Sequence, residues 1–475
     1  MNSELYVLEH RHTQKISNQG RIVVSNKGWI LRIGTLILIS IIVVFTIQTG
    51  LLLNEPLVIL SIILPIHSFL LLAIGWFFYK NPATGKVDNS LVSVIIPVYN
   101  QESMIAKVID AINRSTHRNF EIIAVNDGSK DNTKQILDKL IQKYSTLKVI
   151  HKKNEGKRRA VASGFYASKG KYIVLVDSDS IIDPIALTEF VKSFNGNPKA
   201  GALVGHAKVW NSEKNFLTHL QEVWYDYFFN IRKTTESIFG CVLCCSGCMA
   251  AYRREAITGY IPYWVNLPMT GGDDRELTSY TIAPKWAKKD FANIFQPKLS
   301  VLSKKTLIAM SNYDDAEDRA LTAQTLLTWR SIYVASALVY TDVPENWKIF
   351  FRQQKRWKKG TTRVNFFVST FFWRKNPIMA LIFYLDFMSI FSTPLIITTI
   401  FVYVPIVFGD VIIPLVYFGG MVIPGLAQGL DYKFRDLGAK NWMLKPIMDL
   451  ITSFITSWLI FPSVWGFRKN EWLTR

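Results

Sequence analysis

The chain has 475 residues, enough for two or three domains at roughly 100 to 200 residues each. Hydrophobic residues make up 49% of it and charged residues 19%, which excludes an intrinsically disordered chain and is unusual for a soluble protein. The formal net charge of +19 fits nucleic acid, anionic lipid or a phosphorylated substrate, and composition alone does not separate these partners.

Two stretches near the N-terminus, Ile33 to Asn54 and Pro56 to Tyr79, contain no Asp, Glu, Lys or Arg. Each is long enough to cross the roughly 30 Å hydrocarbon core of a bilayer as a helix. We therefore predict a transmembrane hairpin over 33–79, after a cytosolic segment over 1–32. Cationic residues flank the hairpin on both sides, and the positive-inside rule places both flanks in the cytosol.

Residues 80–340 are expected to form a cytosolic α/β domain. Short apolar runs alternate there with helical segments, which is typical of βαβ units in a mostly parallel sheet. Ligands bind beyond the carboxyl ends of such strands, so the residues that follow each strand are the candidate site residues. The predicted strands are Val92 to Pro97, Glu121 to Val125, Lys148 to Ile150 and Tyr172 to Val176, and the predicted helices cover 101–115, 131–144 and 157–168.

Acidic residues follow two of these strands. Asp127 lies in an Asn-Asp-Gly-Ser segment after the second strand, which is either a turn with a helix cap or part of a binding site. Asp177 and Asp179 follow the fourth strand, where side chains two residues apart point the same way and can converge on one ligand. Two such carboxylates repel each other unless a cation compensates, and a divalent metal that carries a diphosphate would do so.

Other charged or reactive groups lie nearby. Lys157 opens the helix before the fourth strand, where a cation suits a phosphate or belongs to a solvated basic face. Asp273, Asp274 and Arg275 form either an ion-paired cluster or a base with a shifted pKa. Four cysteines within 241–248 are too closely spaced to close well around one zinc ion, so we favour packing beside an acceptor site.

The C-terminal part returns to the membrane. Residues 341–376 mix aromatic and cationic side chains as interfacial amphipathic helices do, and a membrane-surface anchor alone would explain them. Uncharged stretches at Phe387 to Gly409 and Val411 to Leu430 predict a second transmembrane hairpin within 377–432. The last uncharged run, Leu450 to Phe467, either crosses the membrane, or re-enters it or lies in its interface. We favour the second of these for the membrane-associated segment 433–475.

Four segments, over about residues 90–475, resemble in chain order the successive motifs of processive family-2 glycosyltransferases. These segments are Asn126-Asp127-Gly128-Ser129, Asp177-Ser178-Asp179, Gly272-Asp273-Asp274-Arg275 and Gln353-Gln354-Lys355-Arg356-Trp357. Within this group of cellulose, chitin and hyaluronan synthases, the chain is most similar to hyaluronan synthases. That similarity rests on acceptor-side elements, among them Cys245-Ser246-Gly247 and Trp472-Leu473-Thr474-Arg475. Asn126, Cys248-Met249 and Leu473 depart from the family pattern.

The resemblance implies a GT-A fold and a role for each matching residue. Asp127 would contact uracil, Lys157 and Asp177 the nucleotide, and Asp179 an Mn²⁺ or Mg²⁺ ion on the diphosphate. Asp274 would be the general base in a catalytic group with Asp273 and Arg275. Arg356 would steady the leaving diphosphate, and Trp357 would stack on the acceptor sugar. The remaining substrate-binding residues would be Gln353, Cys245, Ser246, Gly247, Trp472 and Arg475.

The sequence therefore predicts a metal-dependent, inverting enzyme of the cell membrane. It would polymerise UDP-sugars at the cytosolic face and export the growing polysaccharide through its own helices. The alternatives are a transferase that adds one sugar to a lipid phosphate carrier, whose enzymes generally lack the Gln353, Arg356 and Trp357 group, and a non-enzymatic scaffold or transporter. Much of the positive charge lies beside membrane segments. We therefore expect the chain to contact a lipid bilayer and not to bind nucleic acid.

Overall fold

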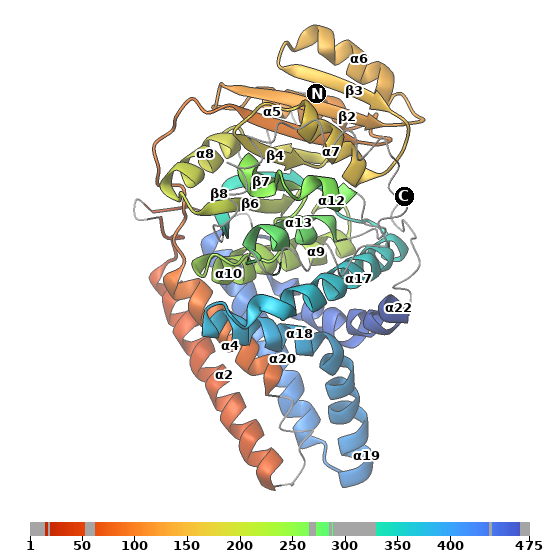
Figure 1. Ribbon diagram of the computed structural model, residues 1–475. Coiled ribbons are helices and arrows are strands. Elements are labelled where there is room, and N and C mark those ends of the chain that lie inside the picture. The colour runs from red at the N-terminus through yellow and green to blue at the C-terminus, as the bar shows by residue number, and fades with distance from the viewer. Residues whose placement is uncertain are drawn as a thin grey trace.

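The computed structural model describes residues 15–17, 20–52, 62–265, 272–284, 287, 329–436 and 439–465. An α/β domain forms one end of the molecule and a bundle of apolar helices forms the other (Figure 1). Helices α2 (Asn26–Leu52) and α4 (Ile63–Phe78) precede the α/β domain in the chain, and the other apolar helices follow it. The predicted insertion of an α/β domain between helical segments is confirmed.

Eight strands form one mixed sheet in the order β3-β2-β1-β4-β7-β6-β8-β5. Its first half is parallel and matches the four predicted strands, with ends shifted by at most two residues. Every residue of β2 and β4 is buried, as expected for parallel strands covered on both faces. The elements of this half are β1 (Val92–Val98), α5 (Ile105–Asn113), β2 (Phe120–Asp127), α6 (Thr133–Lys143), β3 (Leu147–Lys152), α7 (Lys157–Ala167) and β4 (Tyr172–Val176).

The second half of the sheet is assembled from distant parts of the chain. Strand β7 runs antiparallel to both β4 and β6, while β8 runs parallel to β6 and antiparallel to β5. The sequence analysis did not predict this half. Its elements are β5 (Ser180–Ile182), α8 (Ala186–Gly196), β6 (Ala200–Val209), β7 (Met249–Arg253) and β8 (Arg330–Thr341).

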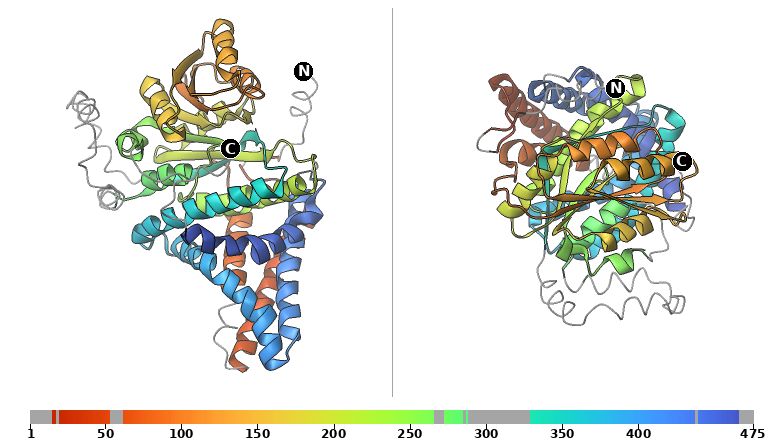
Figure 2. Two further views of the ribbon diagram at one scale, coloured as in Figure 1. Left: turned by 90° about the vertical axis from the view of Figure 1, so that its right-hand side faces the viewer. Right: turned by 90° about the horizontal axis from the view of Figure 1, so that it is seen from above.

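Helices between the sheet and the apolar bundle carry much of the candidate site (Figure 2). Helix α9 begins at an Asn215 capping box and continues through a π-helical turn, η1, into α10. The single long helix α17 covers most of the predicted amphipathic segment. The elements are α9 (Phe216–Tyr227), η1 (Phe228–Lys233), α10 (Thr234–Ile238), α11 (Arg254–Ile257), α12 (Ile261–Val265), α13 (Asp273–Ile282) and α17 (Trp347–Phe372).

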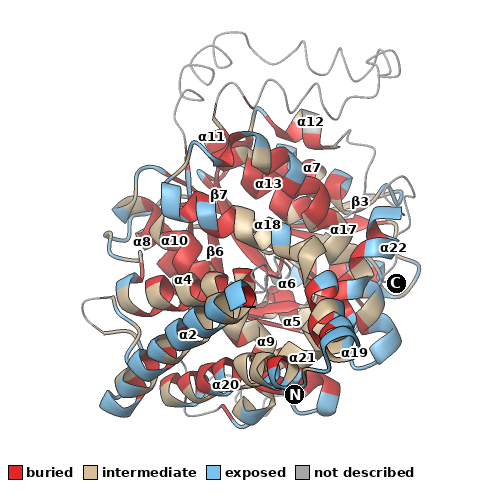
Figure 3. Cartoon of the chain, turned by 90° about the horizontal axis from the view of Figure 1, so that it is seen from below, coloured by how far each residue is buried: buried red, intermediate tan, exposed pale blue. Residues whose placement is uncertain are grey.

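Four helical segments in the described part of the chain are long and apolar enough to cross a membrane. Large apolar side chains such as Ile41 and Leu415 are exposed on them, and Figure 3 shows the exposed faces of α2 and α19. Such faces suit contact with lipid. The segments are α2, then α18 (Pro377–Thr398) with η3 (Thr399–Tyr403) and α19 (Val404–Phe408), α20 (Ile412–Arg435), and the segment Trp442–Trp465.

Two predicted membrane segments differ from the observed helices. Helix α4 has 16 described residues and is shorter than the predicted stretch from Pro56, because residues 53–61 lie outside the described part. The last segment begins earlier than predicted and runs beside α17, across the direction of α2 and α20 (Figure 2). It comprises η4 (Trp442–Leu444), α21 (Lys445–Leu450), η5 (Ile451–Ile455), η6 (Thr456–Leu459) and α22 (Ile460–Trp465).

A buried ionic network ties the apolar helices to α9. Arg32 Nε of α2 lies 2.7 Å from Asp431 Oδ1 of α20, and Arg435 Nε lies 2.7 Å from Asp431 Oδ2. Arg435 also reaches Asp226 of α9, with 2.6 Å between Nη2 and Oδ2. Buried charges are stable only when paired, and removal of one partner typically costs about 3–5 kcal/mol. The network therefore fixes the bundle against the helix that borders the site.

Candidate active site

Lys157 and Asp177 meet beyond the carboxyl end of β4. Lys157 is the first residue of α7, which follows Gly156 at φ 94°, a backbone conformation that favours glycine. Lys157 Nζ lies 2.6 Å from Asp177 Oδ1. Burial alone would lower the pKa of Lys157, but the carboxylates of Asp177 and Asp274 outweigh burial and raise it. The site therefore holds a permanent cation between acidic groups.

Asp274 lies in the first turn of α13 and lines one pocket with Lys157 and Asp177. Its Oδ2 accepts a 2.8 Å hydrogen bond from the backbone N–H of Gly247. A Cβ atom at position 247 would lie 2.9 Å from both Asp274 carboxylate oxygens and from Lys157 Nζ, so the loop reaches Asp274 only as glycine. Burial raises the pKa of Asp274, Asp177 acts in the same direction, and Lys157 opposes both. A carboxylate with a raised pKa in a pocket is suited to general-base chemistry.

The two neighbours of Asp274 make helix-positioning contacts. Arg158 Nε lies 2.6 Å from Asp273 Oδ1, and although burial would raise the pKa of Asp273, Arg158 lowers it below its usual range. Arg275 Nη2 donates a 2.5 Å hydrogen bond to Asn365 Oδ1 of α17. These contacts hold α13 against α7 and α17. Asp273 and Arg275 were predicted to belong to the catalytic group with Asp274, and that role stays a prediction beside these contacts.

Asp127 at the end of β2 anchors the loop that leads to Lys157. Its Oδ1 accepts a 3.0 Å hydrogen bond from the backbone N–H of Glu155, and its Oδ2 accepts one of 2.8 Å from Gly156. Strand β1 separates β2 from β4, so Asp127 and Asp177 lie at opposite sides of the α7 N-terminus. The predicted contact of Asp127 with uracil stays a prediction.

Tyr225 of α9 is influenced electrostatically both by the Asp177-Ser178-Asp179 motif after β4 and by Arg356 of the α17 motif. Burial raises the pKa of Tyr225, and the neighbouring Cys248, Asp179 and Asp177 act in the same direction, while Arg356 opposes them. The phenol group is therefore within electrostatic reach of two acidic residues and of the α17 arginine. Residues more than 170 positions apart in the chain share this region.

Asp177 and Asp179 are the carboxylates that a divalent cation would use. Within the described ranges, no group of three or more His, Cys, Asp and Glu side chains is arranged to hold a metal. Mg²⁺ and Mn²⁺ suit oxygen ligands, and Mg²⁺ at nucleotide sites commonly takes one or two carboxylates together with substrate phosphates. Lys157 engages Asp177, so Asp179 fits the role of principal protein ligand. The residues fit an ion bridged by a diphosphate.

An aromatic surface adjoins Tyr225. Trp357 of α17 stacks on Trp224 of α9 with ring centroids 5.8 Å apart and planes inclined by 13°. Trp224 stacks in turn on Phe228 at 5.6 Å. Extended aromatic faces suit the apolar C–H faces of sugar rings. The sequence analysis missed Trp224 and Tyr225, although the run of aromatic residues at 224–229 was a signal for them.

The cysteine loop supports the helix of Asp274. The backbone N–H of Cys245 donates a 2.9 Å hydrogen bond to Thr278 Oγ1, and Thr278 Oγ1 donates one of 2.6 Å to the backbone oxygen of Asp274. Burial raises the pKa of Cys245 to about 12, so its thiol is protonated at neutral pH. All four cysteines are free. Cys245, Ser246 and Gly247 therefore border Asp274 from the side of β7.

The structure does not test three other predicted substrate-binding residues. Gln353 lies on α17 with a partly buried side chain. Trp472 and Arg475 lie outside the described residues. Their roles stay predictions.

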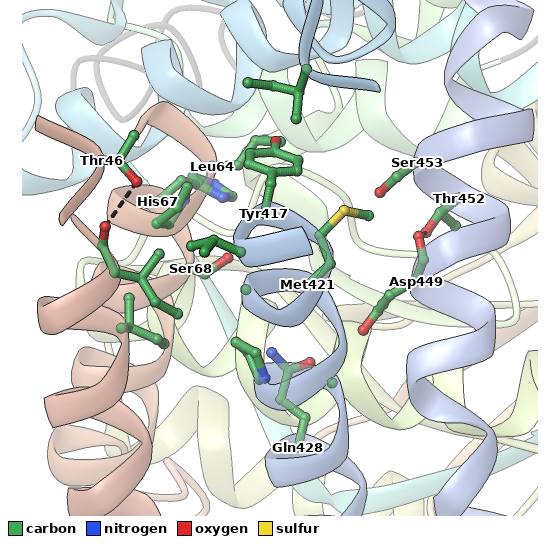
Figure 4. A pocket seen from close by; sticks show the side chains of 18 of the residues that line it. Thr46, Leu64, His67, Ser68, Tyr417, Met421, Gln428, Asp449, Thr452 and Ser453 are labelled. Atoms are coloured by element: carbon green, nitrogen blue, oxygen red, sulfur yellow. Dashed lines mark hydrogen bonds between the residues drawn. The ribbon is translucent and has the colours of Figure 1, made fainter. Parts of the chain in front are cut away.

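A cavity of about 290 Å³ extends from α9 into the apolar helices (Figure 4). Trp224 and Tyr227 line it on the side of α9. Its other walls come from α2, α4, η3, α20, α21 and η5. Trp224 thus belongs both to this cavity and to the stack on Trp357, so the aromatic surface joins the two regions.

Comparisons with known proteins identify similar glycosyltransferases. Residues 93–260 match the model of the glycosyl transferase family 2. The chain is 28% identical over 428 residues to a hyaluronan synthase of Streptococcus pyogenes, covering 86% of this chain and 88% of the relative. It is 29% identical over 288 residues to an N-acetylglucosaminyltransferase of Azorhizobium caulinodans, covering 59% and 61%.

A solved structure shares the fold. The mannosyltransferase PcManGT from Pyrobaculum calidifontis, in complex with GDP-Man and Mn²⁺, superimposes with a TM-score of 0.55 at 14% identity. The match covers 86% of this chain and 98% of that one. The predicted GT-A fold is confirmed.

Proposed function

We propose that this family-2 glycosyltransferase, a relative of the hyaluronan synthases, is a processive and inverting enzyme. It uses UDP-sugars as donors at the cytosolic face of the cell membrane and exports the polymer through its own helices. The proposal rests mainly on α9, because neighbouring residues of this helix belong to two different regions. Tyr225 is within electrostatic reach of Asp177, Asp179 and Arg356, while the adjacent Trp224 lines the cavity among the apolar helices.

Asp274 is the general base of the proposed reaction. It takes the proton from an acceptor hydroxyl as that oxygen bonds to the anomeric carbon of the donor. The bond from the anomeric carbon to the diphosphate oxygen breaks at the same time, and its electron pair leaves with the nucleoside diphosphate. Attack comes from the face opposite the leaving group, so one carboxylate suffices and the anomeric configuration inverts.

The reaction also requires positive charge that neutralises the leaving diphosphate. Lys157 is held beside Asp177, and Arg356 acts electrostatically on Tyr225 as Asp177 does, so both cations suit the diphosphate. A Mn²⁺ or Mg²⁺ ion at Asp179 would supply further neutralisation of the diphosphate charge. Asp127 holds the loop that presents Lys157 and would face the base of the nucleotide.

Processivity rests on where the acceptor would lie. The stacked Trp357 and Trp224 offer a platform for the terminal sugar, and the cavity continues from Trp224. A chain that remains bound there is positioned for the next donor, so repeated transfer needs no release. The family relationship to a hyaluronan synthase over 86% of the chain supports the same proposal.

The alternative is transfer of a single sugar to a lipid phosphate carrier. Product size separates the two functions. Purified protein should convert UDP-sugars and Mn²⁺ into a polymer that elutes early in gel filtration and resists organic extraction. A product that consists only of a single-sugar glycolipid would exclude the polymerase. The scaffold alternative predicts no UDP release at all.

A further inference from the structure

The cavity among the apolar helices has a mixed lining with few charges (Figure 4). Most of its walls are apolar, from residues such as Ile39 of α2, Leu64 of α4 and Met421 of α20. Among the described residues that line it, Lys445 and Asp449 are the only ones with permanent charges, and His67 is the only other titratable group besides two tyrosines.

Lys445 and Asp449 neutralise each other. They lie one turn apart on α21, and Lys445 Nζ lies 2.5 Å from Asp449 Oδ1 and 2.6 Å from Oδ2. Lys445 also lies over the ring of Tyr227, 4.4 Å from its centroid. Because one ammonium group engages both carboxylate oxygens, the pair adds no net charge to the wall, and its burial costs less than that of a lone ion.

His67 does not change this balance. Its Nε2 atom lies 3.9 Å from Asp386 Oδ1 on α18. Asp386 in turn accepts hydrogen bonds of 3.1 and 2.5 Å from the Arg232 guanidinium. If His67 gains a proton, the nearest carboxylate is already beside it. The described wall therefore offers no cation without an acidic partner.

Three polar groups among the described residues that line the cavity lack hydrogen-bond partners, namely His67 Nε2 and two neutral groups on α20. Gln428 Oε1 and Tyr417 Oη, both on α20, are buried without a hydrogen-bond partner in the described structure, and both line the cavity (Figure 4). An unpaired buried polar group destabilises the site that contains it. A ligand with hydroxyl or acetamido N–H groups would remove that destabilisation. Apolar and aromatic walls beside these groups suit the C–H faces of sugar rings.

We propose that this cavity accepts an uncharged glycan, so that the enzyme builds its polymer from neutral hexose or N-acetylhexosamine units without a uronic acid. The inference rests on the proposed polymerase function. A uronate in the cavity would need a cation, since an unpaired ion in an apolar site costs several kcal/mol. Lys445 could serve only by giving up Asp449, which would then be the unpaired charge.

The first test is a donor screen on the full-length protein in proteoliposomes. UDP-GlcNAc, UDP-Glc, UDP-GalNAc and UDP-GlcA are supplied singly, and UDP-GlcNAc is also supplied together with UDP-GlcA. We expect polymer from at least one neutral donor alone, with no change in length when UDP-GlcA is added. Polymer that forms only with UDP-GlcA present overturns the inference and leaves the polymerase function intact. Absence of polymer with every donor overturns both.

The second test measures charge selectivity of the cavity by competition. Chitotetraose and a hyaluronan tetrasaccharide of equal length are compared as inhibitors of UDP release. We expect the neutral oligosaccharide to bind at least about tenfold more tightly, because the anionic one meets no free cation. In Asp449→Asn, which leaves Lys445 unpaired, this ratio should fall at least about threefold. Equal binding by wild type, or an unchanged ratio in the variant, contradicts the inference.

A second variant covers a folding failure of Asp449→Asn. Gln428→Lys places a cation on α20 in the same cavity and leaves the Lys445 pair intact. It should lower the same ratio. Met443→Lys adds the same charge at a position 62% exposed and outside the cavity lining, and it should leave the ratio unchanged.

Discussion

The backbone N–H of Gly247 and the Oδ2 atom of Asp274 are joined by a 2.8 Å hydrogen bond. This bond connects the cysteine loop before β7 to the first turn of α13, where Asp274 lines one pocket with Lys157 and Asp177. The carboxylate of Asp274 is thus held by a backbone contact of the loop. Position 247 and position 274 therefore provide the sharpest tests of the chemistry.

Asp274→Asn should abolish transfer with little effect on donor binding. An amide cannot take the acceptor proton, and general-base catalysis contributes about 10²- to 10⁴-fold. The measurement is UDP release at saturating donor, alongside UDP affinity by calorimetry. Asp138→Asn is the matched control, since Asp138 lies on α6 with a half-exposed side chain. Unchanged turnover in Asp274→Asn would remove Asp274 from the role of base.

Gly247→Ala should reduce turnover roughly 10- to 100-fold by displacing the carboxylate. The added Cβ would lie 2.9 Å from both Asp274 oxygens and Lys157 Nζ, so one of these groups must move. Gly259→Ala serves as the control because nothing lies within 4 Å of its Cβ position. Equal rates in the two variants would show that the loop does not position Asp274.

The rate should fall with acid at a higher pH than an ordinary aspartate would allow. Burial raises the pKa of Asp274, so the carboxylate keeps its proton to higher pH and the base form is lost as pH falls through that raised value. We expect the acid limb of kcat clearly above the usual aspartate pKa of about 3.9. Donor affinity over the same range is the control. A rate that stays constant down to about pH 4 contradicts this assignment.

Trp224→Ala and Trp357→Ala should each shorten the polymer more than they reduce the initial rate of UDP release. Their stacking supports the acceptor, and an aromatic pair contributes about 0.5–1.5 kcal/mol beyond burial, so the double variant should be less than additive. Product length is read by gel filtration. Trp465→Ala is the control, since Trp465 is 94% exposed. Full-length polymer from both single variants would place the acceptor elsewhere.

Arg435→Met should destabilise the protein by about 3–5 kcal/mol, because it leaves Asp226 and Asp431 buried without their shared cation. Lys440→Met removes an exposed pair with Glu213 and should cost at most about 1 kcal/mol. Thermal unfolding in detergent at one protein concentration compares them. Equal stability of the two variants would mean that the network does not hold α20 against α9.

The parallel half of the fold followed from the sequence because each of its strands is a short apolar run between helical segments. Val92 to Pro97 and Tyr172 to Val176 were located almost to the residue. Strands β6, β7 and β8 were not predicted. β8 pairs with β6 from more than 100 residues away, and such pairing depends on tertiary contacts that a local pattern does not encode.

The residues of the candidate site were likewise predictable only in part. Asp177, Lys157 and Asp274 were chosen from local sequence, and the structure brings them into one pocket. Asp273 and Arg275 were grouped with Asp274 through the motif that the resemblance matched, and local sequence did not show that they contact Arg158 and Asn365. Tyr225 and Trp224 were missed because their position depends on the packing of α9 against α17.

In the proposed function, one chain both synthesises the polymer and passes it through the cavity beside Trp224. Purified protein in proteoliposomes, with donor and Mn²⁺ supplied only outside, separates synthesis from export. We predict labelled polymer inside the vesicles, which an added glycoside hydrolase degrades only after detergent is present. Polymer that remains fully accessible outside, or label found only in glycolipid, would contradict the account.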